Sequence, residues 1–182
     1  PVLSLPTLDA DEHIVICSGL IPNLKGQPLV NQWIGVQWSD VTQTHIIPFE
    51  KVVEHANLHR ADLPNRGVRS DISNLQNLVP EAVDAAEAWM SKQRAQFEQE
   101  INTKLDEHLD RLEDLRTRHE NQIELEFQQK DLLESVAESK KQKQLRRVDR
   151  IFDEFYEWIE DTMTTEDHAY IQVVAVLTGE SR

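Results

Sequence analysis

Proline and glycine are so unevenly distributed that they divide the chain in two. All seven prolines and four of the five glycines lie at or before residue 80, and only Gly179 follows. Both residue types interrupt regular structure, so their absence from residues 81–178 predicts long, uninterrupted helix. We therefore expect a boundary near Pro80, with turns and strands before it and helices after it.

Residues 1–80 are predicted to form a strand-rich base with one short helix. Runs that are β-branched or alternate in polarity predict strands at residues 13–17, 32–38 and 44–47. Residues 49–57 have apolar side chains at helical spacing, and residues 60–79 are polar and rich in turn formers, which predicts an irregular segment. In the second strand, alternation would place Trp33, Gly35 and Gln37 on one face and Ile34, Val36 and Trp38 on the other.

Residues 81–163 are predicted to be helical. Pro80 followed by Glu81 is a typical helix start. Apolar residues then recur mostly every three or four positions, which gives a long helix one apolar stripe. The first stripe consists of Ala82, Ala86, Trp89, Phe97, Ile101, Leu105, Leu109, Leu112, Leu115, Ile123 and Phe127. A second, shorter heptad stripe consists of Leu145, Val148, Phe152, Phe155 and Ile159.

The last part, residues 164–182, contains one further predicted strand at residues 170–177. Its run VVAVL is apolar on both faces, which predicts a strand buried within a sheet. Its only possible partners are the N-terminal strands, so the chain must return to the base after residue 163. A single straight helix from residue 80 would instead end roughly 125 Å away.

The helical part must therefore double back. Arms of equal length would place the turn near Asn121, and the alternative is the polar run at residues 139–144. The predicted fold class is α+β. A small mixed β base of N-terminal strands plus the C-terminal strand carries a long antiparallel helical (coiled-coil) hairpin that projects from it.

The net charge of the chain limits how it could bind nucleic acid. The chain has 33 acidic and 19 basic residues and a net charge of -14, which disfavours wrapping duplex DNA over the whole surface. Residues 140–150 nevertheless hold six basic residues and one acid. We predict that this run contacts phosphates; the alternative is a solvated helix face that pairs with acids on the facing arm. The candidate nucleic-acid-binding residues are Lys140, Lys141, Lys143, Arg146, Arg147 and Arg150.

No pattern of residues predicts an enzyme. The sequence lacks the P-loop, the G-x-G-x-x-G pattern and the G-x-S-x-G pattern. His55 and His59 are spaced to present two imidazoles to one metal, but no third ligand is near, so we interpret them as polar surface residues. Cys17 is the single cysteine; we expect it in the core and the chain in a reducing, cytoplasmic compartment. No apolar run is long enough to span a membrane.

The C-terminal segment resembles a known family. Residues 146–179, RRVDRIFDEFYEWIEDTMTTEDHAYIQVVAVLTG, are similar to the C-terminal region of large bacterial Swi/Snf-type helicase-like ATPases, including those of phage-defence islands of the DISARM kind. Its most specific parts are residues 153–167 and 170–179, and the resemblance extends in style back to about residue 13. The family's phosphate-binding and DEAH-type motor motifs have no counterpart here, so no catalytic residue carries over.

The resemblance implies a non-catalytic C-terminal accessory domain of a helicase-like DNA translocase. The sequence begins with Pro1 and its first methionine is Met90, so we expect a piece of a longer protein, with ATP and magnesium bound only in motor domains elsewhere in the parent. Expected partners are those motor domains, DNA and a partner protein. The alternative function is a coiled-coil assembly module that forms a homodimer through the stripe at residues 97–127 and never touches nucleic acid.

Overall fold

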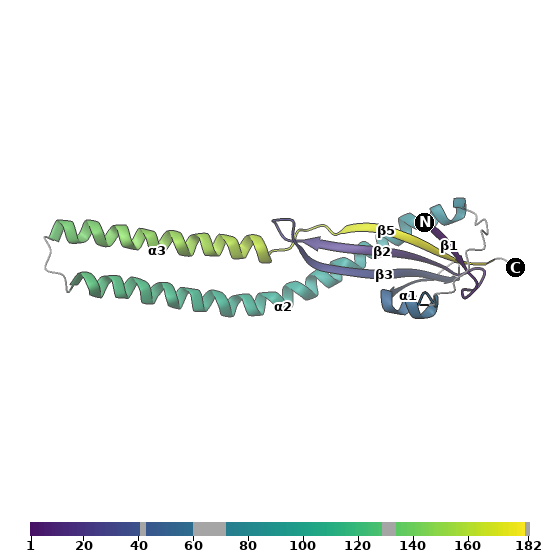
Figure 1. The fold of residues 1–182 in the computed structure, drawn as a ribbon, viewed down its shortest axis with the longest axis horizontal. Helices are drawn as coiled ribbons and strands as arrows, with labels where there is room; N and C mark the ends of the chain where they lie inside the picture. The colour runs from purple at the N-terminus through teal and green to yellow at the C-terminus, as the bar shows by residue number, and fades with distance from the viewer. Residues whose placement is uncertain (41–42, 60–71, 129–133, 181–182) are drawn as a thin grey trace. The chain divides into compact units, whose positions relative to one another are not determined.

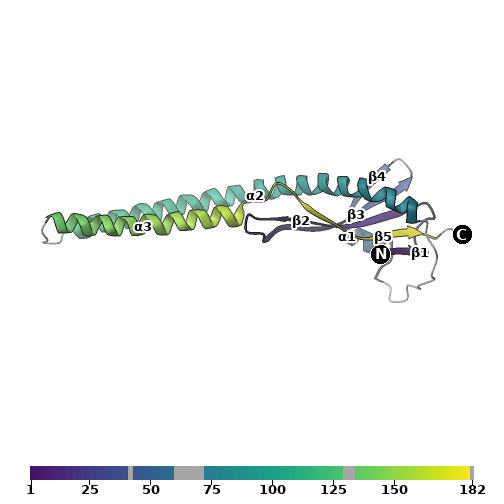
Figure 2. The same cartoon turned by 90° about the horizontal axis from the view of Figure 1, so that it is seen from above.

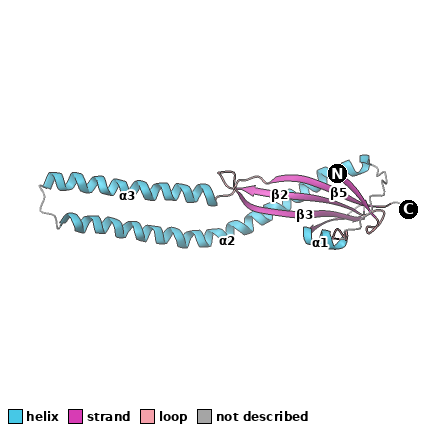
Figure 3. Cartoon of the chain, in the orientation of Figure 1, coloured by secondary structure: helices cyan, strands magenta, loops and turns pink. Residues whose placement is uncertain are grey.

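A computed structural model describes residues 1–40, 43–59, 72–128 and 134–180 (Figures 1 and 3). The chain divides into two compact units. The first comprises residues 1–22, 26–96 and 165–182 and contains the sheet. The second comprises residues 23–25 and 97–164 and consists mainly of helix.

The first unit is built on a five-stranded mixed sheet, in the order β1-β5-β2-β3-β4. The pair β1–β5 is parallel, and all other neighbours are antiparallel. The C-terminal strand therefore lies between two N-terminal strands, which confirms the prediction drawn from its two apolar faces. The strand β1 was not predicted, and β2 and β3 are longer than predicted. The strands are β1 (Val2–Leu5), β2 (His13–Pro22), β3 (Pro28–Asp40), β4 (Gln43–Pro48) and β5 (Tyr170–Gly179).

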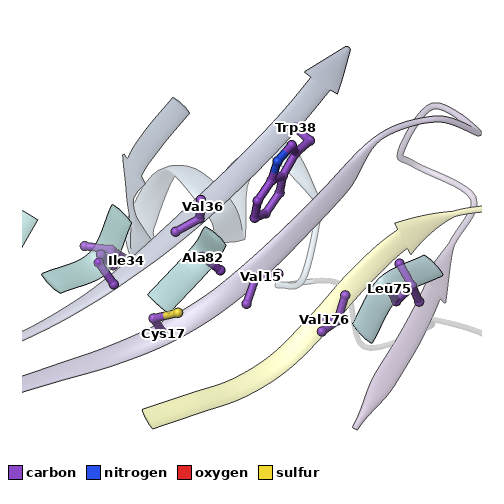
Figure 4. Packing of buried hydrophobic residues seen from close by; sticks show 9 residues of the cluster. Val15, Cys17, Ile34, Val36, Trp38, Leu75, Ala82 and Val176 are labelled. Atoms are coloured by element: carbon purple, nitrogen blue, oxygen red, sulfur yellow. The ribbon is translucent and has the colours of Figure 1, made fainter. Parts of the chain in front are cut away.

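Helices cover both faces of this sheet. The first part of α2 (Ile72–Gln128) runs along one face, and α1 (Phe49–His55) covers the other (Figure 2). The predicted alternation in β3 is confirmed. Ile34, Val36 and Trp38 belong to the cluster under α2, and Trp33 contacts Phe49 of α1 with ring centroids 5.4 Å apart. The cluster under α2 consists of Val15, Cys17, Ile34, Val36, Trp38, Leu75, Ala82, Ala86 and Val176 (Figure 4).

Two glycines allow the helices to approach the sheet closely. A Cβ atom at Gly19 would lie 2.5 Å from Sδ of Met90 on α2. A Cβ atom at Gly35 would meet Cγ2 of Val52 on α1, below any normal contact distance. Glycine at these two strand positions therefore sets how near each helix can pack.

The second unit is an antiparallel pair formed by α2 and α3 (Glu134–Met163). Lys141 contacts Glu124 at 2.7 Å, whereas Asp149, further along α3, contacts Arg116, earlier on α2, at 2.8 Å. A later residue of α3 thus contacts an earlier residue of α2, so the two helices are antiparallel. The predicted α+β fold, with a mixed sheet and a long antiparallel helix pair, is confirmed.

The predicted start of the first long helix was wrong. The helix α2 begins at Ile72, so Pro80 lies inside it and residues 72–79 are helical rather than irregular. Proline inside a helix removes one hydrogen bond and costs about 3 kcal/mol. Leu75, one turn upstream of Pro80, is buried against the sheet, and packing of this kind outweighs local propensity. Residues 60–71 lie outside the described residues.

Both predicted positions of the turn between the helices were also wrong. Asn121 lies within α2, and residues 139–144 lie within α3. The assumption of equal arms failed because the first part of the 57-residue α2 belongs to the sheet unit. Its remainder, residues 97–128, is about as long as the 30-residue α3. The connection at residues 129–133 lies outside the described residues.

Candidate nucleic-acid interface

The cationic run predicted to contact phosphates lies on α3, and packing against α2 decides which side chains face outward. Leu145, Val148 and Phe152 of the predicted stripe are half-buried, and Ile159 is buried. Phe155 differs from the prediction because it is 49% exposed, and Tyr156 takes the inward position instead. The Tyr156 hydroxyl donates a hydrogen bond to Glu113 of α2 at 2.9 Å.

Four of the six predicted cations are fully available. Lys140, Lys143, Arg146 and Arg147 are exposed, and none of them forms an ion pair with any residue that the structure describes. On a helix with a rise of 1.5 Å per residue, residues 140–150 span about 15 Å. This length matches about four phosphates of one nucleic-acid strand, which carries one charge per roughly 3.4 Å of duplex.

The other two predicted cations have partners within the chain. Lys141 points toward α2, where its ammonium group lies 2.7 Å from Glu124, and this hydrogen bond raises the pKa of Lys141. Arg150 lies 3.7 Å from Glu154 one turn later, with both side chains largely exposed. The alternative interpretation, pairing with acids on the facing arm, therefore holds for Lys141, whereas the outer cations make no ion pair with a residue in the described ranges.

A layer of charged residues between the two helices fixes which side of α3 faces α2. Arg116 donates from Nη2 to Asp149 at 2.8 Å and from Nε to Glu120 at 3.0 Å. Hydrogen bonds to these two carboxylates raise the pKa of Arg116. The predicted stripe placed Leu115 here, but Leu115 is exposed and Arg116 faces α3. The four-residue step from Leu112 was the only signal that could have identified Arg116 from the sequence.

A groove of about 560 Å³ lies between the two helices beside the cationic run. Its walls include His119 and Ile123 from α2 and Arg147, Ile151 and Phe152 from α3. The ring of His119 contacts that of Phe152, with centroids 6.5 Å apart. The groove is mostly apolar and open, so it extends the exposed surface next to Arg147 rather than enclosing a small ligand.

The histidine pair considered for a metal does not form a shared site. The helix α1 ends at His55, and Asn57 takes a left-handed conformation with φ of 53°, so His59 lies beyond the helix. His55 instead contacts the buried carboxylate of Glu12 at 2.6 Å, and Gln37 donates to the same oxygen at 2.5 Å. Within the described ranges, no cluster of three or more histidine, cysteine or acidic side chains is placed to hold a metal ion.

Cys17 lies in the core, as predicted. Its side chain is fully buried beneath α2, and burial raises the pKa of the thiol to about 11. A thiol in this state carries almost no thiolate at neutral pH and is chemically inert.

None of the described helices is both long and apolar enough to cross a bilayer. No protein-family model, no curated protein and no solved structure matches this chain.

Proposed function

We propose that the chain is a non-catalytic accessory domain of an ATP-dependent helicase-like DNA translocase, which helps to position the motor on DNA or on a partner. The translocase context comes from the resemblance of residues 146–179 to that family. The observation that supports a DNA-handling role is the outer face of α3, where Lys140, Lys143, Arg146 and Arg147 are exposed and make no ion pair with any described residue.

The expected contact is with the phosphate backbone. Lysine and arginine on a helix surface neutralise phosphates without reading base sequence, so binding should be insensitive to sequence. Contacts to about four phosphates would make log K fall with log salt at a slope of about -3 to -4. Acidic residues 153–161 follow at once on the same helix and limit the contact to the basic half.

Fluorescence anisotropy across a salt series tests this proposal, with single-stranded and duplex probes. The triple variant Arg146→Gln, Arg147→Gln and Arg150→Gln should abolish the salt-sensitive binding while helicity measured by circular dichroism stays unchanged. A matched control removes the same charge from exposed positions of α2, at Lys104, Arg111 and Arg118, and should bind like the unmodified chain. Absence of binding at low salt, or equal loss in both variants, would contradict the proposal.

The second candidate is a protein–protein assembly module with no nucleic-acid contact. The stripe first predicted for dimerisation, within residues 97–127, is largely half-buried in the α2–α3 pair of one chain. Three large exposed apolar side chains lie within two turns of α3, at Ile151, Phe155 and Trp158, whereas the exposed Leu115 and Leu125 of α2 are ten residues apart. This observation favours assembly through α3 rather than through α2. DNA binding in the anisotropy series separates the two candidates, because only the first predicts it.

A further inference from the structure

One flank of α3, beside the groove between the helices, carries an apolar stripe that α2 leaves about half exposed. Ile151 is 46% exposed, and Phe155 and Trp158 are each 49% exposed. They follow one another at intervals of four and three residues, so they share one face of the helix. The rings of Phe155 and Trp158 contact edge to face, with centroids 6.0 Å apart. Large aromatic side chains grouped on a helix surface typically mark an interaction site.

A line of charged residues runs beside this stripe. Its seven members recur at intervals of three, four, three, four, three and four residues, which keeps them on one side of the helix. The first four are cations and the last three are acids, so the sign changes once, between Arg150 and Glu154, where the apolar stripe begins. Six of them are exposed and the last is half-buried. They are Lys140, Lys143, Arg147, Arg150, Glu154, Glu157 and Asp161.

We infer that this face of α3 pairs with the same face of a second copy of the chain, with the two α3 helices antiparallel. A two-fold axis near residue 152 would place Arg150 opposite Glu154 of the second copy. The same axis brings Arg147 to Glu157 and Lys143 to Asp161. The apolar stripes then overlap at their first turn, where Ile151 is offset from Phe155 of the second copy by two residues, about 3 Å along the helix, and Trp158 lies opposite Arg146.

The order of charges selects this arrangement over the alternatives. In a parallel two-fold pair each residue would face its own copy, so cations would meet cations and acids would meet acids. A single change of sign along the line makes the surface complementary to itself only when reversed. A second copy therefore fits this face by charge as well as by apolar contact.

The ion pairs that these residues already make within one chain are weak enough to be replaced by ion pairs to a second copy. Arg150 lies 3.7 Å from Glu154 of the same chain, and both side chains are about 70% exposed. Asp161 lies 3.3 Å from Lys25, with both side chains exposed by more than a third. Exposed ion pairs of this kind add little to stability. The residues of α3 that face α2 are not needed for the second contact.

Sedimentation velocity of the full chain over a range of concentrations tests the inference. The unmodified chain should approach twice its monomer mass as concentration rises. Reversing only the cations (Lys143→Glu, Arg147→Glu, Arg150→Glu) or only the acids (Glu154→Lys, Glu157→Lys, Asp161→Lys) should weaken self-association at least about tenfold. Reversal of Lys104, Arg111 and Arg118 on α2 is the matched control and should leave the mass unchanged.

Mixing the two charge-reversed variants is the decisive measurement. A variant that fails to self-associate only because it misfolds could not form a mixed dimer. An equimolar mixture of the cation-reversed and acid-reversed chains should form a mixed dimer, and a chain that carries all six reversals should self-associate again. A monomeric unmodified chain, or a mixture that stays monomeric while both components retain their helicity, would overturn the inference.

This inference does not rest on DNA binding, and the acid-reversed variant separates the two proposals. That variant should lose self-association yet bind DNA more tightly, because its cations remain and nearby acids have become basic. The cation-reversed variant should lose both activities. Because DNA and the second copy would use the same three cations, DNA should dissociate the dimer; a dimer that binds DNA without dissociating would contradict the shared surface.

Discussion

At the scale of single residues, Arg116 best illustrates how a charged group can replace an apolar one between two helices. It lies where the heptad pattern expects leucine, and only 27% of its side chain is exposed. Its two carboxylate partners come from opposite helices, Glu120 from α2 and Asp149 from α3. An ion pair held at one layer of a helix pair permits one register and disfavours shifted ones.

Replacing Arg116 with Ala should lower the free energy of unfolding by about 1 kcal/mol, because the half-buried Asp149 loses its partner. Chemical denaturation measures this change. Replacing Arg116 and Asp149 together with Leu should recover most of the loss, since neither charge is then left unpaired. Arg111→Ala, on the exposed side of the same helix, is the control and should change stability by less than about 0.5 kcal/mol. A double variant as unstable as the single one would contradict this explanation, because the loss could not then come from an unpaired Asp149.

At the scale of elements, α2 is a helix that begins earlier and ends later than its sequence indicates. Pro80 is a strong start signal on local grounds, yet it lies inside the helix. The residues that extend the helix upstream do so because Leu75 packs into the sheet core, next to strands that are distant in sequence. Local propensity cannot report such a contact.

The Pro80→Ala variant should therefore stabilise the chain, by about 1–3 kcal/mol, because it restores a backbone hydrogen bond inside a helix. Thermal unfolding followed by circular dichroism measures the change. Ala82→Pro, two positions along the same helix, is the opposing control and should destabilise strongly. A lower melting temperature for Pro80→Ala would mean that the sheet requires the helix shape that proline imposes.

What could be predicted for the elements followed from periodicity. Alternation in β3 correctly assigned Ile34 and Trp33 to opposite faces, and the apolar run of β5 correctly predicted a central strand. Helix ends and the turn between the helices could not be predicted. They depend on how much of α2 packs against the sheet, and this length is set by the folded unit rather than by any local sequence pattern.

The candidate site was predicted only in part, for the same reason. The cationic run could be found from composition, and Lys140 and Arg146 are exposed as a phosphate contact requires. The inward orientation of Lys141 and the outward one of Phe155 depend on where α2 lies against α3. A difference of one position in the heptad pattern moves a side chain by about 100° around the helix, which the sequence alone cannot fix.

At the scale of the whole molecule, the two units differ in how much apolar surface they bury. Among the described residues, Ile159 is the one buried hydrophobic residue of the helical unit, whereas the sheet unit contains the clusters on both faces of the sheet. Stability follows buried apolar area, so the two units should open at different free energies.

We expect two thermal transitions. The helical signal in far-ultraviolet circular dichroism should decrease first, and the near-ultraviolet signal of the buried Trp38 should decrease at a higher temperature. Phe152→Ala, on the inward side of α3, should lower the first transition, and Val36→Ala in the sheet should lower the second. A single coincident transition by both probes would show that the continuous α2 makes the units unfold together.

The position of β5 also has a consequence during synthesis. Of the described strands, β1 is hydrogen-bonded only to β5, and β5 separates it from β2. While the ribosome is still making the helices, the first strand has no neighbour to join and the edge of β2 stays open. The position between β1 and β2 stays unoccupied until β5 has been synthesised. Closure of the sheet is thus a late event, and premature termination anywhere before residue 170 leaves β1 without a partner and one edge of β2 exposed to other chains.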